Sequence, residues 1–341
     1  MPHYSLGVVV SANGFGHIRR QLLIVTRLLK KRPELRVAFG VTEAQYKRFF
    51  AEFSNFEDRV AVLPGLTDDS PKWRHGASEY SDQNLSGWLR DFRSCEPLVD
   101  ADFVISDNLV EALSVRDDAW LSGSFLWSDV LETYSPVNAS CARFVERERQ
   151  LLGECRPTML ANKYLATDGV RRRTQLVELG WMIEDSGVLP VHPRELVLIH
   201  GGGTRTLDVT VKRIANELRV SGLGVMTDLE GDIERFDYSD EMWARVGLVI
   251  CRPGVGTVTE CVKWQIPMLL LPDQSNTEAR HVLGILVADG YASTLENADH
   301  ISRAELLVRV RESMDVEVEA LSRLDRDGLD QATSWIEKRI A

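Results

Sequence analysis

The sequence lacks three features that would each point to a particular class of protein. It has five cysteines, an odd number, and no C-x-x-C motif, so neither a disulfide framework nor a zinc site is expected. It lacks an excess of positive charge, because 51 acidic residues outweigh 40 lysines and arginines and give a net charge of -11. It also lacks long hydrophobic runs. The apolar run near the start, LGVVV, is far shorter than a membrane span or a signal-peptide core.

These absences narrow the range of partners and locations. A negative overall field repels nucleic acid and anionic membranes, so no nucleic acid is expected as a partner. Membrane contact stays open, although no segment indicates it. Reduced thiols fit a cytoplasmic location best, so we expect the chain to be cytoplasmic.

What the sequence does contain is an alternation of apolar runs and amphipathic stretches. Its 341 residues suffice for two domains of roughly 150 residues each. In the first half, helical spacing at 18–33 and 44–53 alternates with apolar runs. We expect strands at 5–12, 35–41, 59–65, 102–107, 120–127 and 158–165. This rhythm predicts an α/β fold with a parallel sheet covered on both faces.

The alternation starts again after a change of composition near Ile183. The segment EDSGVLPVHPREL contains two prolines and little periodicity, which is typical of an interdomain linker. A helix is expected at 207–220, and the chain is helical and charged from Ser302 onward. Further strands are expected at 196–203, 222–228, 246–254, 267–273 and 291–295. The polar stretch 68–87 interrupts the first series and is read as a long loop, either a lid or a disordered insert.

The first candidate site is SANGFGHIRR, Ser11 to Arg20, directly after the first predicted strand. As a dinucleotide fingerprint it is poor, because Arg19 stands where the third glycine belongs. As a sugar-transfer site it offers His17, a residue type that acts as a base near neutral pH. A histidine that merely caps the helix is the alternative.

A carboxylate that could orient His17 is expected from the same sheet. Asp107 ends the strand at 102–107, and ligands bind beyond the carboxyl ends of such strands. Asp107 could therefore hold the tautomer of His17 by a hydrogen bond. Asp129 could do the same, and a purely structural aspartate is the alternative.

The second half contains three further loops with polar groups. In RPGVGTVTE, a glycine turn after Arg252 opens a helix whose free N–H groups favour an anion, and Glu260 lies one turn further on. In HGGGTRT, glycines let the backbone approach a ligand. In PDQSNTE, polar side chains could bind sugar hydroxyls. A plain turn or a solvated loop is the alternative in each case.

With these motifs the chain resembles the GT-B glycosyltransferases, in particular the peptidoglycan N-acetylglucosaminyltransferase-like branch (family 28) and the glycosyltransferase-like region of L-arabinokinases. The resemblance spans nearly the whole chain. GFGHIRR is similar to the branch's G-x-G-H-x-x-R, and RPGVGTVTE to its P-G-x-G-T-x-x-E. The Glu278 segment and ISDNLVEAL followed by SFLW also resemble the family.

The resemblance implies two Rossmann-like domains that face a central cleft. It implies an acceptor-binding domain at 1–183, a nucleotide-sugar-binding domain at 184–320, and a helix at 321–341 that packs back on the first domain. It also implies an inverting transferase without a bound metal or cofactor, whose partners are a nucleotide-sugar donor and an unknown acceptor. The catalytic pair would be His17 and Asp107. The acceptor side would comprise Asn13, Gly14, Gly16, Arg20 and Trp127. The donor side would comprise Gly202, Gly203, Arg252, Gly254, Gly256, Thr257, Glu260, Gln274 and Glu278.

Two other functions remain open on the sequence. Chains of this fold also act as nucleotide-sugar hydrolases or epimerases, in which water or the sugar itself replaces the acceptor. A non-catalytic module that binds a nucleotide sugar is the other alternative, because fold alone does not fix function.

Overall fold

A computed structural model describes residues 3–71, 82–132, 139–202, 207–229, 235–273, 277–315 and 319–340. The chain divides into two compact units. Unit 1 comprises Met1–Met182 and Asp327–Ala341, and unit 2 comprises Ile183–Arg326. The first boundary lies directly before the proline-containing segment 184–196, and the second lies between Arg326 and Asp327.

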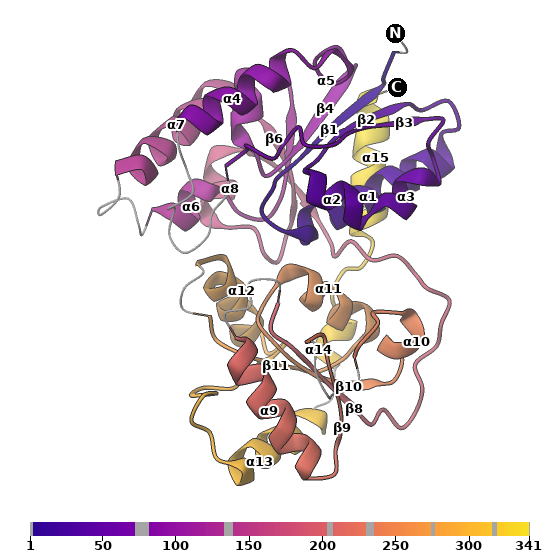
Figure 1. Cartoon of the computed structure of the whole chain (residues 1–341), viewed down its shortest axis with the longest axis vertical. Helices are drawn as coiled ribbons and strands as arrows, with labels where there is room; N and C mark the ends of the chain where they lie inside the picture. Colours follow the sequence, from indigo (N-terminus) through magenta and orange to yellow (C-terminus); the bar gives the residue numbers. More distant parts are fainter. Residues whose placement is uncertain are drawn as a thin grey trace. The chain divides into compact units, whose positions relative to one another are not determined.

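Unit 1 contains a parallel sheet of seven strands in the order β3-β2-β1-β4-β5-β6-β7 (Figure 1). The chain starts at the centre of this sheet, builds outward to β3, and then returns to place β4 on the other side of β1. The strands are β1 Leu6–Val10, β2 Val37–Gly40, β3 Val60–Leu63, β4 Phe103–Asp107, β5 Trp120–Ser122, β6 Thr158–Asn162 and β7 Gln175–Leu179. The sheet is therefore doubly wound, with its switch point between β1 and β4.

The helices of unit 1 cover both faces of this sheet. Along β1, Leu6, Val8 and Val10 point to one face and Val9 to the other, as the two-residue period of a strand requires. The first face packs against α1 and α15, and the second against α4, α5 and α7 (Figure 1). The helical elements are α1 Phe15–Lys31, α2 Glu43–Arg48, α3 Phe50–Ser54, α4 Asp82–Arg93, α5 Glu96–Val99, η1 Val110–Ser114, α6 Trp127–Leu131, α7 Ala139–Cys155, α8 Asp168–Arg173 and α15 Gly328–Ile340.

Unit 2 contains a parallel sheet of five strands in the order β12-β11-β10-β8-β9. Its switch point lies between β8 and β10. Helices α9 and α13 cover one face through Val211, Ile214, Leu306 and Val310. The elements are β8 Leu196–His200, α9 Asp208–Val220, β9 Gly224–Thr227, α10 Asp240–Trp243, β10 Val246–Cys251, α11 Val255–Trp264, β11 Met268–Leu270, α12 Thr277–Ala288, β12 Ser293–Thr294, α13 Arg303–Met314 and α14 Glu319–Ser322.

Helix α15 returns the chain to unit 1, where it packs beside α1. Its residues Leu329, Ala332 and Ile336 are buried in the core shared with α1. Asp330 pairs with Arg27 of α1 at 2.7 Å. Among the helices that the structure describes, none is long and apolar enough to cross a membrane.

Several expected elements differ from the structure in extent. The apolar run 120–127 is a strand only to Ser122, because Gly123 has a φ of 153° and the chain then turns into α6 at Trp127. The helix expected at 44–53 is two helices, which meet at Phe49. Residues 82–87, expected in a loop, belong to α4, whereas 72–81 lie outside the described residues.

The expected terminal helix is also not continuous. Its residues divide between α14 and α15, and residues 323–327 form the connection between these two helices. Strand β7, which the sequence pattern did not indicate, pairs with β6 along its whole length.

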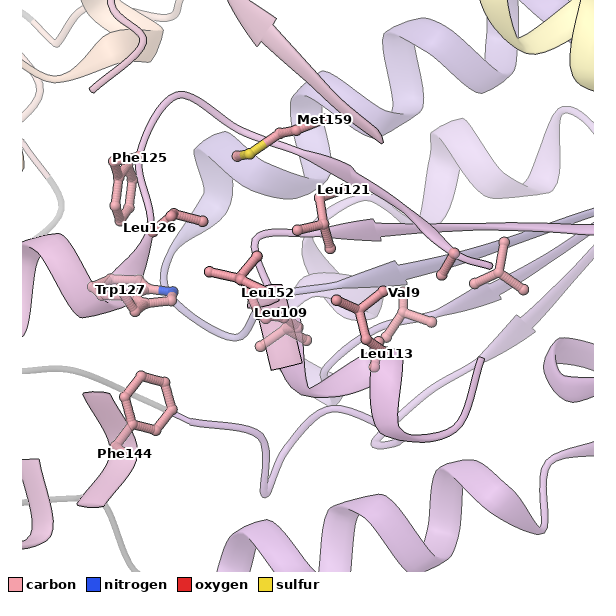
Figure 2. Packing of buried hydrophobic residues seen from close by; sticks show 14 of the residues in the cluster. Val9, Leu109, Leu113, Leu121, Phe125, Leu126, Trp127, Phe144, Leu152 and Met159 are labelled. Carbon is pink, nitrogen blue, oxygen red and sulfur yellow. The ribbon is translucent and has the colours of Figure 1, made fainter. Parts of the chain in front are cut away.

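Figure 2 shows part of the core of unit 1, which consists of aromatic and aliphatic residues. Unit 1 also contains two buried acidic side chains. Glu111 of η1 and Glu148 of α7 are 1% and 0% exposed. Burial raises the pKa of Glu111 to about 8, assisted by the nearby charge of Glu148. Burial likewise raises the pKa of Glu148 to about 7, although a hydrogen bond of 2.7 Å from the Ser128 backbone N–H opposes the shift. Neither carboxyl oxygen of Glu111 has a hydrogen-bond partner within the part of the chain that the structure describes.

This pair makes the stability of the chain depend on pH. The pKa values of both groups in the folded chain lie above the ordinary value of 4.5, so folding takes up protons between about pH 4.5 and 8. The stability that the protonated pair contributes is therefore lost as the pH rises through this window. We predict that Glu111→Gln, which keeps the shape without the charge, raises the free energy of unfolding by about 2–4 kcal/mol at pH 8.5 and changes it little at pH 5.

Denaturant unfolding at the two pH values measures this difference. Glu146→Gln is the matched control, because Glu146 lies on the same helix α7 but is exposed. An equal effect of the two substitutions at pH 8.5 would show that the charge of the buried pair does not lower the free energy of unfolding.

Candidate functional site

The first half-site lies at the switch point of unit 1, where β1 and β4 end side by side. Val10 pairs with Asp107 in the parallel register, so the turn after β1 and the carboxylate at the end of β4 meet at one edge of the sheet. The turn requires Gly14, whose φ of 101° is unfavourable for other residues. Gln45 of α2 secures the turn by donating to the backbone oxygens of Ser11 and Gly14, at 2.8 and 3.0 Å.

Asp107 is the centre of this half-site. It is fully buried and lies 2.7 Å from Nδ1 of His17. Arg20 donates to both of its oxygens, at 2.6 and 3.1 Å, and Gln21 donates to Oδ2 at 2.6 Å. Burial alone would raise the pKa of Asp107, but the charges of Arg20 and His17 outweigh it and hold the pKa below the ordinary value of 3.8.

The charge on Asp107 determines the tautomer of His17. An ionised carboxylate can only accept hydrogen bonds, so Nδ1 of His17 carries the proton that it donates to Asp107. The lone pair of the neutral ring then lies on Nε2. The side chain of His17 is 12% exposed, so the ring is held mostly inside the protein while remaining partly accessible. This arrangement can accept a proton at Nε2.

The structure brings some of the expected acceptor-side residues to this place and not others. Asn13 lies in the turn, where its side chain donates to Ser11 Oγ at 2.9 Å and to the backbone oxygen of Pro71 at 2.7 Å. Gly16 is exposed in the first turn of α1. Trp127 is instead buried in the core of unit 1, with its ring edge-on to Phe125 at 5.0 Å (Figure 2).

Asp129, the alternative partner of His17, has a different set of contacts. It accepts a hydrogen bond from Thr167 at 2.7 Å and pairs with Arg173 at 2.8 Å. The residue that sequence reasoning missed is Gln21, which links Asp107 to Ser122 Oγ of β5 at 2.9 Å. Its position could have indicated it, because His17, Arg20 and Gln21 have the i, i+3, i+4 spacing of one helix face.

The second half-site lies at the carboxyl edge of the sheet in unit 2. Cys251 at the end of β10 is in register with His200 of β8 and Leu270 of β11, so the loops after these three strands start at one edge. Arg252 follows Cys251, and its Nε lies 2.8 Å from Oδ2 of Asp273, which follows β11. Both side chains are mostly buried.

Helix α11 begins directly after Arg252 and Pro253. Its N-cap is Gly254, in an extended conformation and without a side-chain cap, so the N–H groups of the first turn are open to a ligand. Gly256 is exposed there and Thr257 half-buried, while Glu260, one turn further on, is buried. Helix α11 has ten residues, and its N-terminus follows the guanidinium-bearing Arg252 closely in the chain. Such a helix N-terminus can bind an anion such as phosphate.

The remaining donor-side residues are described in part. Gly202 has a φ of 78°, and a Cβ built on it would lie 3.6 Å from Nη1 of Arg252. Glu278 is half-buried in the first turn of α12. Gly203 and Gln274 lie outside the described residues. Over the ranges that the structure describes, no group of three or more His, Cys, Asp or Glu side chains could hold a metal ion.

Removing the central carboxylate of the first half-site should destabilise unit 1. The pKa of Asp107 lies below its ordinary value in the folded chain, so its contribution is present above about pH 4 and is lost as the pH falls through the folded-state value. We predict that Asp107→Asn lowers the free energy of unfolding at pH 7 by about 3 kcal/mol, because the guanidinium of Arg20 loses its buried partner.

Denaturant unfolding of the wild type and of Asp107→Asn at pH 7 and pH 3 measures this contribution. The difference between their free energies of unfolding should be smaller at pH 3. Asp118→Asn is the control, since Asp118 pairs with Arg116 near the surface and should change stability by about 1 kcal/mol or less. A loss for Asp107→Asn no larger than that of the control would contradict the prediction.

Comparisons with known proteins agree with this architecture. Residues 197–297 match the model of the glycosyltransferase family 28 C-terminal domain. A search of curated protein sequences found no match. Among solved structures, the chain is similar to LpCGTa in complex with UDP, with 14% identity, a TM-score of 0.71 and 100% of each chain covered.

Two further solved structures show the same similarity of fold. The calicheamicin glycosyltransferase CalG4 has 15% identity and a TM-score of 0.69, with 99% of each chain covered. UGT71G1 of Medicago truncatula, complexed with UDP-glucose, has 9% identity and a TM-score of 0.68, also with 99% of each chain covered. The chain therefore shares the GT-B fold of these glycosyltransferases, and its residues 197–297 match the family 28 C-terminal domain.

Proposed function

We propose that the protein transfers a sugar from a nucleotide-sugar donor to a hydroxyl group of an acceptor. The observation that carries the proposal is the His17–Asp107 contact of 2.7 Å at the switch point of unit 1. The family 28 match in unit 2 and the UDP or UDP-glucose bound to proteins of similar fold support a nucleotide sugar as the donor. In this proposal unit 1 binds the acceptor and unit 2 the donor.

The reaction is a single displacement at the anomeric carbon of the sugar. Nε2 of His17 takes the proton of the acceptor hydroxyl, whose oxygen forms the new bond to the anomeric carbon. The bond from that carbon to the diphosphate breaks, and the nucleoside diphosphate leaves with the electron pair. One displacement inverts the configuration at this carbon, so we propose an inverting enzyme. Asp107 stabilises the imidazolium that forms, because its charge lies next to Nδ1.

The leaving diphosphate gains negative charge as its bond to the sugar breaks. In our proposal the first turn of α11, from Gly254 to Thr257, and the guanidinium of Arg252 compensate this charge, which is the task that a metal ion performs in other transferases. Glu260 binds the ribose, and Gln274 and Glu278 bind the sugar. In our proposal the protein acts in the cytoplasm.

The test of the proposal is a turnover assay with a panel of nucleotide sugars and hydroxyl acceptors. We predict that His17→Gln lowers kcat by about 10²- to 10⁴-fold, the usual contribution of a general base, and leaves binding of the nucleoside diphosphate within about twofold. Isothermal titration calorimetry measures the binding. His300→Gln is the control, because His300 is exposed and belongs to unit 2.

The same assay separates the other functions of this fold. Donor consumed without any acceptor would favour a hydrolase or an epimerase. Tight nucleotide binding with no turnover of any donor would favour a binding module. Loss of nucleotide binding in His17→Gln would contradict the role of His17 as a base.

A further inference from the structure

Unit 2 contains a second histidine–aspartate pair, which the reaction above does not use. His200 is the last residue of β8, and its Nδ1 lies 2.7 Å from Oδ2 of Asp228, which directly follows the neighbouring strand β9. The two side chains are 16% and 19% exposed. The hydroxyl of Tyr238 lies 3.1 Å from the same Nδ1.

Contacts with Asp228 and Tyr238 hold the imidazole of His200 in one orientation. Burial would raise the pKa of Asp228, but the hydrogen bond and charge of His200 outweigh it and lower the pKa, with a contribution from Tyr238. Asp228 is therefore ionised and accepts the proton of Nδ1. Tyr238 is itself fixed by edge-on packing against Phe236 at 5.1 Å, and it has a φ of 62°, which is costly for an aromatic residue.

The position of His200 in the fold indicates what it could bind. It ends β8 at the switch point of unit 2, opposite Cys251 of β10, and its backbone oxygen accepts from the N–H of Arg252 at 3.3 Å. The glycine turn at Gly202 follows it, and α11 begins three residues after Arg252, at Val255. The imidazole thus belongs to the same strand edge as the groups to which we assign the diphosphate.

Nε2 of His200 is the ring nitrogen that could contact a phosphate. Nδ1 is taken by Asp228, and within the described residues Nε2 of His200 has no hydrogen-bond partner and is not among the buried polar atoms that lack one. Because Asp228 fixes the ring through Nδ1, Nε2 is the atom left to contact a ligand, and an imidazole N–H is a suitable hydrogen-bond donor to a phosphate oxygen.

We propose that His200 binds the diphosphate of the nucleotide-sugar donor through Nε2, and that Asp228 is the residue that positions it. This inference rests on the proposed function, because it assigns a further ligand to the same donor site. It adds a contact that the glycine turns and Arg252 do not provide, namely a side-chain donor from the other strand of the switch point.

The experiment compares phosphate recognition with nucleoside recognition. Calorimetry measures binding of UDP, dTDP, GDP and ADP, and of the four corresponding nucleosides, to the full chain. For the diphosphate that binds the wild type most tightly, His200→Gln should weaken binding roughly 10- to 100-fold, the effect of losing a charge-assisted hydrogen bond. Binding of the matching nucleoside should change less than about twofold.

Two further variants test the positioning role of Asp228. Asp228→Asn should weaken binding of the diphosphate by about 5- to 20-fold, because a neutral amide holds Nδ1–H less strongly than a carboxylate and no longer fixes the orientation of the ring. Nitrogen NMR of the imidazole should show the loss of the Nδ1–H tautomer, a change that a merely structural role would not produce. Tyr238→Phe removes only the hydroxyl and should keep the affinity within about threefold, and His300→Gln should match the wild type.

The outcomes separate this inference from the proposed function. If the wild type binds none of the four diphosphates, the donor assignment fails and this inference fails with it. If the wild type binds a diphosphate and His200→Gln binds it equally well, only this inference is overturned. Equal losses for diphosphate and nucleoside would also overturn it, because they would indicate a structural defect rather than a lost phosphate contact. Thermal unfolding of each variant shows whether it is folded.

Discussion

A single buried carboxylate holds the first half-site together. Asp107 is fully enclosed by protein, and it is tolerated there because His17, Arg20 and Gln21 satisfy it with hydrogen bonds from one face of α1. A charge in such a place must be paired, since its desolvation is costly. The contact therefore joins β4 to α1 and at the same time orients the imidazole. Fold and chemistry depend here on the same few atoms.

Both units pair a histidine with an aspartate at the carboxyl edge of their sheet, but the two residues come from different places along the chain. In unit 1 the histidine follows the first strand by a glycine turn, and the aspartate ends β4 across the switch point. In unit 2 the histidine ends the first strand itself, and the aspartate follows β9 on the outer side. In both pairs Nδ1 faces the carboxylate, so Nε2 is the ring nitrogen left for a ligand. We propose an acceptor hydroxyl as that ligand in unit 1 and a phosphate in unit 2.

Much of the fold was predictable because buried parallel strands are short and almost wholly apolar. Runs such as Leu6–Val10 and Val246–Cys251 are recognisable in the sequence as continuous apolar segments. Strand β7, Gln175–Leu179, was not recognisable in this way, because it lies at the sheet edge and carries polar residues at its exposed positions. The run 120–127 was overextended because hydrophobicity continues through Gly123, where only the backbone conformation changes.

The candidate site was predictable where strand ends determine it, as for His17, Asp107 and Arg252. Gln21 and the His200–Asp228 pair were not recognised, since glutamine carries no charge and Asp228 lies beyond a strand whose register the sequence does not state. Glu111 and Glu148 are 37 positions apart and come near each other only through packing of η1 on α7, so no local pattern could reveal that the charge of one raises the pKa of the other. Trp127, chosen from a motif, proved to be a core residue, because a motif does not say which way a side chain points.

The return of α15 to unit 1 has a consequence for biosynthesis. Helix α15 covers one face of the first sheet with Leu329, Ala332 and Ile336. These residues leave the ribosome only after the whole of unit 2 has been synthesised, so this face cannot be covered earlier. Until then, apolar side chains of α1 and β1 have no cover from this helix. The nascent chain therefore carries an unfinished hydrophobic surface through nearly half of its translation, and this is the stage at which a chaperone would be needed.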